Sequence, residues 1–302
     1  MNKQELSALV AEILQGLGKE PMVKASEYKP TAPQPEQEKT GYQPGDFVED
    51  VTKLDLRKLY MVENPKNGEA FCRLKEKTPA RLGAGRAGPR YKTLSMLRFR
   101  ADHAAAQDAV FSQVPEDFAK KNDLLPLQSC CKDKDQYLTR PDLGRKLNEE
   151  SAQKLRAEVQ TPPQVQLVIG DGLSSAAILA NAMDCMATIR DGLKLRGIET
   201  GKAAFVRYCR VGAGDAVGDV TGCRVVCVLV GERPGLVTDK SMSAYITYSP
   251  HSGIPESTRT VVSNIHSQGT PAVEAGAHIA ELIATILEKK VSGVALHLEG
   301  SV

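Results

Sequence analysis

Three glycine-containing segments in the second half of the chain have the residue types and spacing best suited to bind a ligand. They are residues 170–175 (GDGLSS), 210–215 (RVGAGD) and 231–235 (GERPG), and each follows a run of apolar or β-branched residues. Such runs are typical of buried strands, and in open α/β sheets ligands bind beyond the carboxyl ends of the strands. Glycine also lets a ligand approach the backbone closely. We therefore expect these loops to form a binding site.

The first and third of these loops also have a simpler interpretation. The first places backbone amides before the start of a helix, which suits a phosphate or polar ligand but equally a tight turn that packs helix on sheet. It is an incomplete dinucleotide fingerprint, because Ser175 replaces the last glycine and no clear acid for a ribose follows. In the third loop, Glu232 and Arg233 either face a ligand or pair with each other at the surface, which would contribute about 0–1 kcal/mol.

The histidines do not have the spacing of a metal site. All five are scattered, and none has a cysteine two to four residues away. Residues 264–269 (NIHSQG) are similar to the Asp-x-His-x-x-Gly loop whose histidine ligates cobalt in one class of cobalamin proteins. Asn264 stands where aspartate would orient the imidazole, and residues 267–302 are too few for the α/β module that normally follows. We therefore expect no metal ligand here, and no cobalt ligation by His266.

Composition argues against several classes of protein. The 302 residues are 41% apolar, carry a net charge of +2 and include no Trp, so neither nucleic acid nor a membrane is an expected partner. The seven cysteines follow no knuckle spacing, which favours a reducing compartment over disulfides. From Arg73 to Arg100 nine Lys and Arg accompany one acid, Glu76. This basic stretch is either a docking surface for an acidic partner or phosphate, or a solvated face.

The first 48 residues are expected to be separate from the rest of the chain. Apolar residues at positions 6, 9, 10, 13, 14 and 17 form one stripe of an amphipathic helix over residues 1–18. Residues 19–48 are rich in Pro, Lys, Glu and Gln, which predicts a flexible linker. A short helix on a tether either packs on its own domain or is a docking peptide.

Two domains are predicted after the linker. Residues 49–160 have helical patterns broken by Pro and Gly and no convincing strand, which indicates a mainly helical domain. In residues 161–302, strands near 165–169, 203–211, 224–230 and 245–248 alternate with helices over 174–195 and 271–290. Strands that are apolar on both faces are typical of parallel sheets. The predicted fold class is α/β, with a doubly wound Rossmann-like C-terminal domain.

Several blocks of residues occur in the order found in a known family. They are GRAGPR (85–90), LRF (97–99), ADH (101–103), YLTRPD (137–142), DGLS (171–174), FVRY (205–208), LVGERPGL (229–236), YSP (248–250) and SNIH (263–266). Over about residues 55–295 the chain resembles the small (light) subunit of ethanolamine ammonia-lyase.

The resemblance implies a hetero-oligomer in which adenosylcobalamin lies between this chain and a larger barrel subunit. There, an adenosyl radical takes hydrogen from ethanolamine, and acetaldehyde and ammonia leave. The family's substrate and catalytic residues lie in the large subunit, so no catalytic residue is expected in this chain. The family's cofactor contacts correspond to Val211, Glu232 and Val261, the last of which is usually cysteine.

The resemblance also implies a location. In this family an N-terminal peptide can direct the enzyme into a bacterial microcompartment of the ethanolamine-utilisation type, and residues 1–18 with the adjoining linker fit that role, with the shell as partner. Two other functions stay open: a non-catalytic adaptor whose function is the tethered helix, and a nucleotide-binding Rossmann enzyme.

Overall fold

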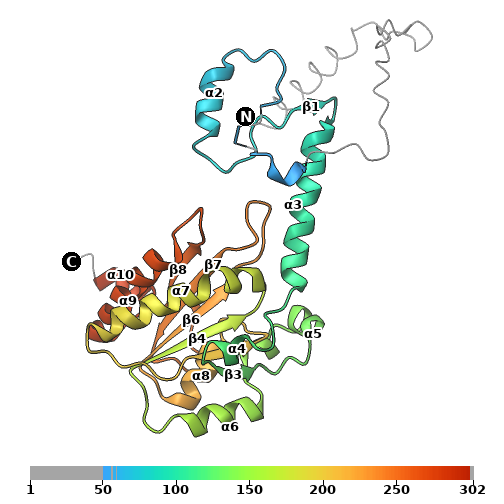
Figure 1. The fold of residues 1–302 in the computed structure, drawn as a ribbon. Coiled ribbons are helices and arrows are strands. Elements are labelled where there is room, and N and C mark those ends of the chain that lie inside the picture. Colours follow the sequence, from blue (N-terminus) through green and yellow to red (C-terminus); the bar gives the residue numbers. More distant parts are fainter. Residues whose placement is uncertain (1–49, 56, 59, 300–302) are drawn as a thin grey trace, which may run out of the picture. The chain divides into compact units, whose positions relative to one another are not determined.

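The computed structural model describes residues 50–55, 57–58 and 60–299. The predicted helix over residues 1–18 and the linker over 19–48 lie outside the described residues. At the centre of the described part is a six-stranded sheet in the order β3-β5-β4-β6-β7-β8 (Figure 1). Its strands are β3 (Leu125–Gln128), β4 (Val165–Asp171), β5 (Ala204–Arg207), β6 (Val225–Gly231), β7 (Met242–Tyr248) and β8 (Arg259–Ile265). With helices packed against it, this sheet confirms the predicted α/β class.

The sheet is mixed rather than wholly parallel. β3, β5, β4 and β6 run parallel, whereas β7 pairs antiparallel with β6 and β8 pairs antiparallel with β7. The prediction that the strand near 245–248 is parallel was therefore wrong. A parallel connection needs a crossover of about a dozen residues or more, usually a helix. Residues 232–241, which join β6 to β7, contain no helix, so the chain turns straight back.

The expectation of no strand within residues 49–160 was also wrong. β3 lies in that range and pairs parallel with β5, so the sheet takes one strand from outside residues 161–302. β3 is short and contains Pro126, which fits only an edge strand because proline cannot donate to a ladder. The hairpin β1 (Arg86–Ala87) and β2 (Arg90–Tyr91) lies in the same range.

Most other elements in residues 50–160 are helical. They are η1 (Val51–Lys53), α2 (Gly68–Lys75), α3 (Thr93–Phe111), α4 (Phe118–Lys121), α5 (Lys134–Thr139), η2 (Leu143–Arg145) and α6 (Glu149–Glu158). In the remainder lie α7 (Ser175–Lys194), α8 (Ala213–Thr221), η3 (Glu256–Thr258), α9 (Ala272–Lys289) and α10 (Val294–Glu299). None of the helices that could be described is long and apolar enough to cross a bilayer.

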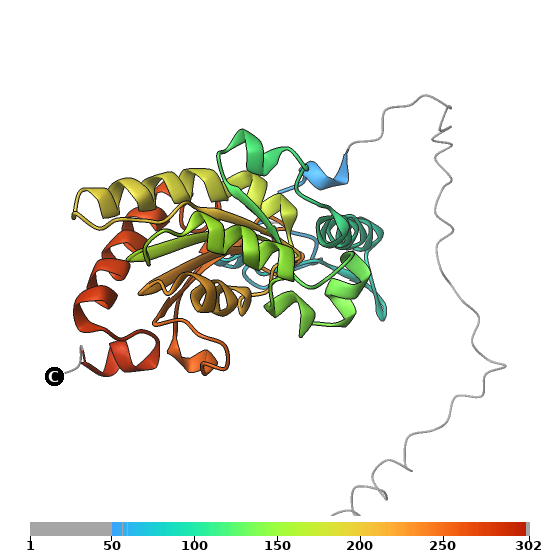
Figure 2. The same cartoon turned by 90° about the horizontal axis from the view of Figure 1, so that it is seen from below.

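Helices cover both faces of the sheet. α7 and α9 lie on one face, and α8 with α6 lies on the other (Figures 1 and 2). Successive residues of β4 enter opposite cores, since Ile169 packs under α7 and α9 whereas Val168 packs under α8 and α6. Both side chains are fully buried, which explains why this strand is apolar without alternation.

Local sequence signals define α7, the helix that follows β4. The Ser174 side chain accepts a hydrogen bond from the Ala177 amide, which satisfies an otherwise unpaired helix N–H. Beyond its far end, Gly197 has a φ of 67°, a conformation that favours glycine. The predicted helix over 174–195 therefore agrees closely with the observed one.

One edge of the sheet collects the loops predicted to bind a ligand. β5, β4 and β6 are adjacent and parallel, so the loops after Arg207, Asp171 and Gly231 leave the sheet on the same side. β7 starts at this edge and β8 ends there, because Gly231 pairs with Met242 and Met242 pairs with Ile265. The topology thus brings segments far apart in the sequence to one place.

Candidate functional site

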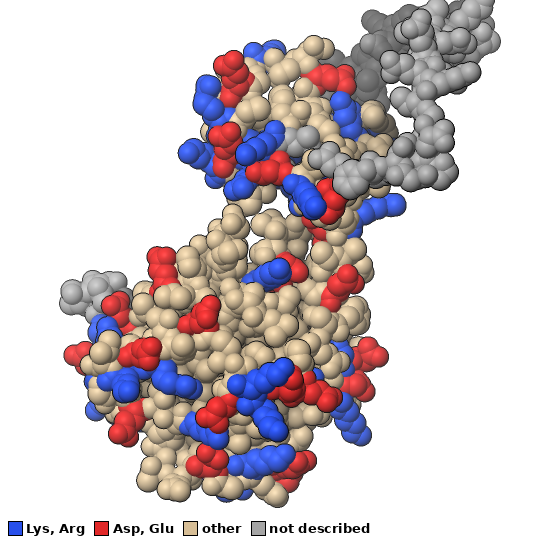
Figure 3. Space-filling view, viewed as in Figure 1, with Lys and Arg blue, Asp and Glu red and all other residues tan. Residues whose placement is uncertain are grey.

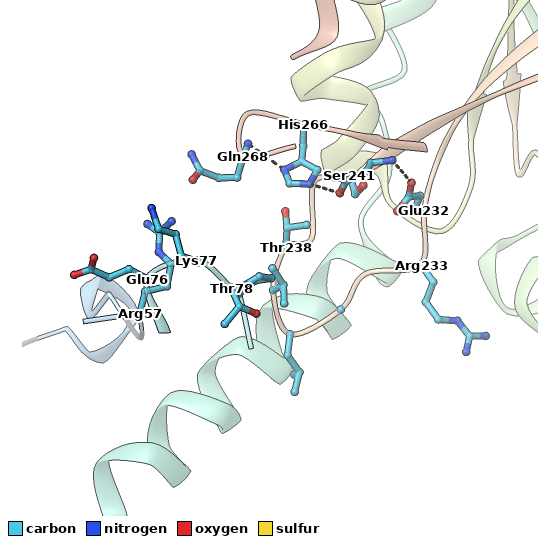
Figure 4. A pocket seen from close by; sticks show the side chains of 15 residues that line it. Arg57, Glu76, Lys77, Thr78, Glu232, Arg233, Thr238, Ser241, His266 and Gln268 are labelled. Carbon is cyan, nitrogen blue, oxygen red and sulfur yellow. Dashed lines mark hydrogen bonds between the residues drawn. The ribbon is translucent and has the colours of Figure 1, made fainter. Parts of the chain in front are cut away.

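Glu232 directly follows β6 and is held by hydrogen bonds from two neighbouring strands. Its amide donates to the Ser241 carbonyl at 2.9 Å, which closes the loop between β6 and β7. Its Oε1 accepts from the Ser243 hydroxyl at 2.6 Å. The same oxygen accepts from the Asn264 amide at 2.8 Å (Figure 4). Both bonds end on one carboxylate oxygen, which leaves Oε2 available to a ligand.

The hydrogen bonds keep Glu232 ionised at neutral pH. Partial burial by itself raises the pKa of this carboxyl group, because charge is less stable away from water. The bonds from Asn264 and Ser243 favour the charged form, as do the nearby Ser241 and His266, and together these effects outweigh burial, so the pKa of Glu232 lies below its ordinary value. Glu232 is therefore a hydrogen-bond acceptor here, not an acid that donates protons at neutral pH.

Glu232 and Arg233 do not form the ion pair that was one interpretation of this loop. Arg233 is exposed, and its side chain points away from the Glu232 carboxylate (Figure 4). Within the described residues neither of the two forms a salt bridge, so this interpretation is wrong. Both charges are available for other partners.

Val211 lies in the loop between β5 and α8, just before the residue that caps α8. The glycines of this loop pack the protein rather than admit a ligand. A Cβ on Gly214 would lie 2.6 Å from Val228 Cγ2, so glycine is required for α8 to lie close to β6. In the first loop, a Cβ on Gly172 would lie 2.8 Å from the Cys209 carbonyl oxygen. At both positions glycine is needed for internal packing, of α8 on β6 at Gly214 and of the loop after β4 on the Cys209 backbone at Gly172.

Val211 and Glu232 line the same cavity, of about 150 Å³. They come from loops after different strands, and the cavity lies between them at the carboxyl edge of the sheet. The other residues around it are Tyr137, Leu173, Cys209, Arg210, Val230, Gly231, Arg233, Ser243 and Tyr245. The structure thus unites two of the three residues that the resemblance assigned to the cofactor. Sequence reasoning assigned no role to the tyrosines, although Tyr137 begins the YLTRPD block, because no local pattern shows that it lies beside Glu232.

Val261, the third assigned residue, lies beside this cavity rather than in its wall. It is on β8 directly opposite Tyr245 of β7, and paired residues of antiparallel strands present their side chains on the same face. Its side chain is 46% exposed, which is high for an apolar residue on a strand. Val261 therefore extends the apolar surface next to the cavity.

The thiol and phenol groups in the wall of this cavity are neutral at physiological pH. Burial raises the pKa of the Cys209 thiol to about 12, and the nearby charge of Asp171 adds to this effect. Burial likewise raises the pKa of Tyr137, and the pKa of Tyr245 is raised by burial and then by the charge of Glu232. None of these groups is a nucleophile or base at neutral pH.

His266 holds a neighbour of Glu232 in place by hydrogen bonds within the chain. The Gln268 amide donates to Nδ1 at 3.2 Å, so Nε2 carries the proton and donates to the Asn264 side-chain oxygen at 2.8 Å. Both ring nitrogens are engaged, and the imidazole holds the residue whose amide binds Glu232 (Figure 4). Across the part of the chain that the structure describes, no cluster of three His, Cys, Asp or Glu side chains could hold a metal ion.

Several basic residues of the stretch from Arg73 to Arg100 form ion pairs within the chain. Arg81 and Arg98 share the carboxylate of Asp102, at 2.6 and 2.9 Å. Lys92 pairs with Glu63 at 2.7 Å. On the face drawn in Figure 3, basic and acidic side chains are interspersed, so that face has no large area of one charge.

A second cavity, of about 560 Å³, is lined by Lys77 of this stretch and also by Glu232 (Figure 4).

Comparisons with known proteins give one consistent result. A model of the family described as ethanolamine ammonia-lyase light chain matches residues 68–297. The chain is 58% identical over 251 residues to the ethanolamine ammonia-lyase small subunit of Clostridium perfringens, and the aligned residues make up 83% of this chain and 85% of the relative. It is 59% identical over 249 residues to that of Clostridioides difficile, covering 82% and 85%. With the small subunit of Listeria innocua it shares 50% identity over 296 residues, 98% of this chain and 100% of the relative.

Proposed function

Because this chain belongs to the ethanolamine ammonia-lyase light chain family, we propose that it is the cofactor-contacting small subunit of a two-subunit lyase. The enzyme converts ethanolamine to acetaldehyde and ammonia and uses adenosylcobalamin, which lies at the interface with the large subunit. When bound, this cofactor supplies the adenosyl radical that abstracts hydrogen from the substrate. The observation that carries the proposal is the meeting of Val211 and Glu232 at one cavity at the sheet edge.

The dimensions and chemistry of the cavity fit part of a corrinoid. About 150 Å³ is too small for a whole corrin with its side chains, which fits a seat that this chain shares with the large subunit. The ionised Glu232 offers Oε2 to an amide N–H, and amides are the polar groups on the corrin periphery. Val211, Leu173 and Val230 supply apolar contact beside it.

The role of this chain is to orient and shield the cofactor. The wall contains neutral thiol and phenol groups, apolar side chains and the arginines Arg210 and Arg233, and Glu232 is held ionised by its hydrogen bonds. No proton transfer to substrate is required of them, and the residues that bind substrate belong to the large subunit. Val261, where the family usually has cysteine, supports the corrin by bulk alone.

Reconstitution with the large subunit tests this function. Both chains and adenosylcobalamin together are expected to release ammonia from ethanolamine, and neither chain alone is expected to do so. In the assembled complex, Glu232→Gln should weaken cofactor binding by about 10- to 100-fold, because a hydrogen bond to a charged acceptor contributes about 1.5–3 kcal/mol. Affinity is measured by spectroscopic titration with hydroxocobalamin.

Asp239→Asn is the matched control for Glu232→Gln. Asp239 lies in the same loop between β6 and β7, carries the same charge and lines neither of the two cavities described above. It should leave cofactor affinity unchanged. Unchanged affinity in Glu232→Gln would favour the adaptor function instead, and activity of the isolated chain would refute the two-subunit proposal.

We also propose that residues 1–18 direct the enzyme into a bacterial microcompartment within the cytoplasm by binding the shell. The apolar stripe at positions 6, 9, 10, 13, 14 and 17 supports this location, together with the start of the family match at residue 68. A fluorescent protein fused to residues 1–18 should form foci in cells that express a shell. Leu9→Glu should disperse them, whereas Glu12→Gln, off the stripe, should not. Diffuse fluorescence of the unaltered fusion would refute the proposal.

A further inference from the structure

Arg210 lies in the wall of the Val211–Glu232 cavity with its hydrogen-bonding capacity only partly used. One terminal nitrogen, Nη2, donates to the Tyr137 carbonyl at 2.9 Å, and the guanidinium lies over the Tyr137 ring, 4.5 Å from its centroid. Its Nε is buried and has no hydrogen-bond partner. A buried donor without an acceptor is rare in folded proteins and calls for an explanation, of which a partner from outside the chain is one.

The charge of Arg210 is also uncompensated. Within the described residues no carboxylate forms an ion pair with it, although it is half-buried. Glu232 lies in the same cavity, but its hydrogen bonds come from Ser243 and Asn264. A guanidinium cannot lose its proton at physiological pH, so it remains a cation that attracts an acceptor from outside the chain.

The backbone around Arg210 holds its side chain in place. The Arg210 amide donates to the Gly144 carbonyl at 2.9 Å. A Cβ on Gly144 would lie 2.7 Å from Arg210 Cγ, so the absence of a side chain at position 144 makes room for the arginine. With the ring of Tyr137 beneath it, the guanidinium is positioned before any ligand arrives, which lowers the entropy cost of binding.

We infer that Arg210 binds an anionic oxygen of the cofactor, and that this oxygen belongs to the phosphodiester of the cofactor's nucleotide loop. This assignment rests on the proposed function. The amide side chains of a corrin are neutral, and the phosphodiester is the one anionic group of cobalamin. Glu232 and Arg210 then divide the recognition: the carboxylate accepts from an amide N–H, and the guanidinium donates to phosphate, for which its forked geometry is suited.

Three probes separate phosphate recognition from corrin recognition. Cobalamin has the complete nucleotide loop, cobinamide phosphate has the phosphate without the base, and cobinamide has neither. Each is titrated into the assembled two-subunit complex, and binding is followed by the corrin absorption spectrum. Arg210→Gln should weaken binding of cobalamin and of cobinamide phosphate by about 10- to 100-fold, the loss of a charged hydrogen bond. Binding of cobinamide should change by less than about twofold.

Controls identify the cause of any loss. Arg190→Gln removes the same charge from an exposed position on α7 outside the cavity, and it should leave all three affinities unchanged. Glu232→Gln should weaken all three probes equally, because its proposed contact is to the corrin. Arg210→Lys keeps the positive charge but lacks the forked guanidinium. It should weaken the binding of cobalamin and cobinamide phosphate by less than Arg210→Gln does. This variant keeps the test decisive if Arg210→Gln does not fold.

Four outcomes would overturn the assignment. An equal loss for cobinamide would place Arg210 against the corrin, and no loss for any probe would mean that it does not touch the cofactor. Weaker assembly of the Arg210→Gln complex without cofactor would assign the arginine to an acid of the large subunit. If the unaltered complex bound none of the probes, the proposed function itself would fail, a result distinct from the other three.

Discussion

Asp215 and Arg259 form a buried ion pair that joins α8, which follows Val211, to β8, which contains Val261. Asp215 is in the first turn of α8, and Arg259 begins β8. The two terminal guanidinium nitrogens donate to the two carboxylate oxygens at 2.8 and 2.7 Å, and the side chains are only 4% and 8% exposed. Asp215→Asn would leave the guanidinium buried with part of its charge uncompensated.

The expected loss of stability depends on the contacts that remain. Removal of one partner of a buried ion pair typically costs about 3–5 kcal/mol. Arg259 keeps a bond of 2.6 Å to Glu256 and one of 3.2 Å to the Thr247 hydroxyl, so we expect the lower end, about 3 kcal/mol. For a protein of this size that corresponds to a fall in Tm of roughly 6–12 °C.

Thermal unfolding of the full chain, monitored by circular dichroism, measures this effect. The control is Asp142→Asn, which breaks an Arg140–Asp142 pair with the same two-pronged geometry, 3.0 and 2.8 Å, but with side chains 59% and 53% exposed. Exposed pairs contribute about 0–1 kcal/mol, so Tm should fall by less than about 4 °C. If Asp215→Asn lowered Tm no more than Asp142→Asn, the argument that burial makes the first pair structurally important would be refuted.

Two further predictions concern the cavity and the packing beside it. Ser243→Ala removes one of the bonds that lower the pKa of Glu232, while burial, which raises this pKa, remains. Cofactor affinity should fall as pH drops through the pKa of Glu232, so in the variant complex it should begin to fall at a higher pH. Coincident pH profiles of the two complexes, measured by titration, would contradict this. Gly214→Ala should lower the stability of the chain by about 1–3 kcal/mol in urea unfolding, because its Cβ would meet Val228 at 2.6 Å, whereas Gly235→Ala, with nothing within 4 Å, should be neutral.

Local patterns determined a large part of this protein. The α/β class, the buried strands near 165–169 and 224–230, and α7 with its cap at Ser174 could all be predicted, because apolar runs and caps act within a few residues. The loops at 210–215 and 231–235 could be placed beyond strand ends for the same reason. The pattern had already singled out Glu232, whereas the choice of Val211 and Val261 came from the resemblance.

Only the tertiary structure decided which of these segments meet. The existence of β3 and the direction of β7 depend on hydrogen bonds between strands that are distant in the sequence. The short run that contains Pro126 has no local signal that it forms a strand beside β5. The loop after β6 likewise has no local signal for the direction in which the next strand runs. The same applies to the cavity, whose wall joins Tyr137 and Arg210 to Glu232. Residue types determine what chemistry each side chain can perform, whereas long-range pairing of the strands determines which side chains can perform it together.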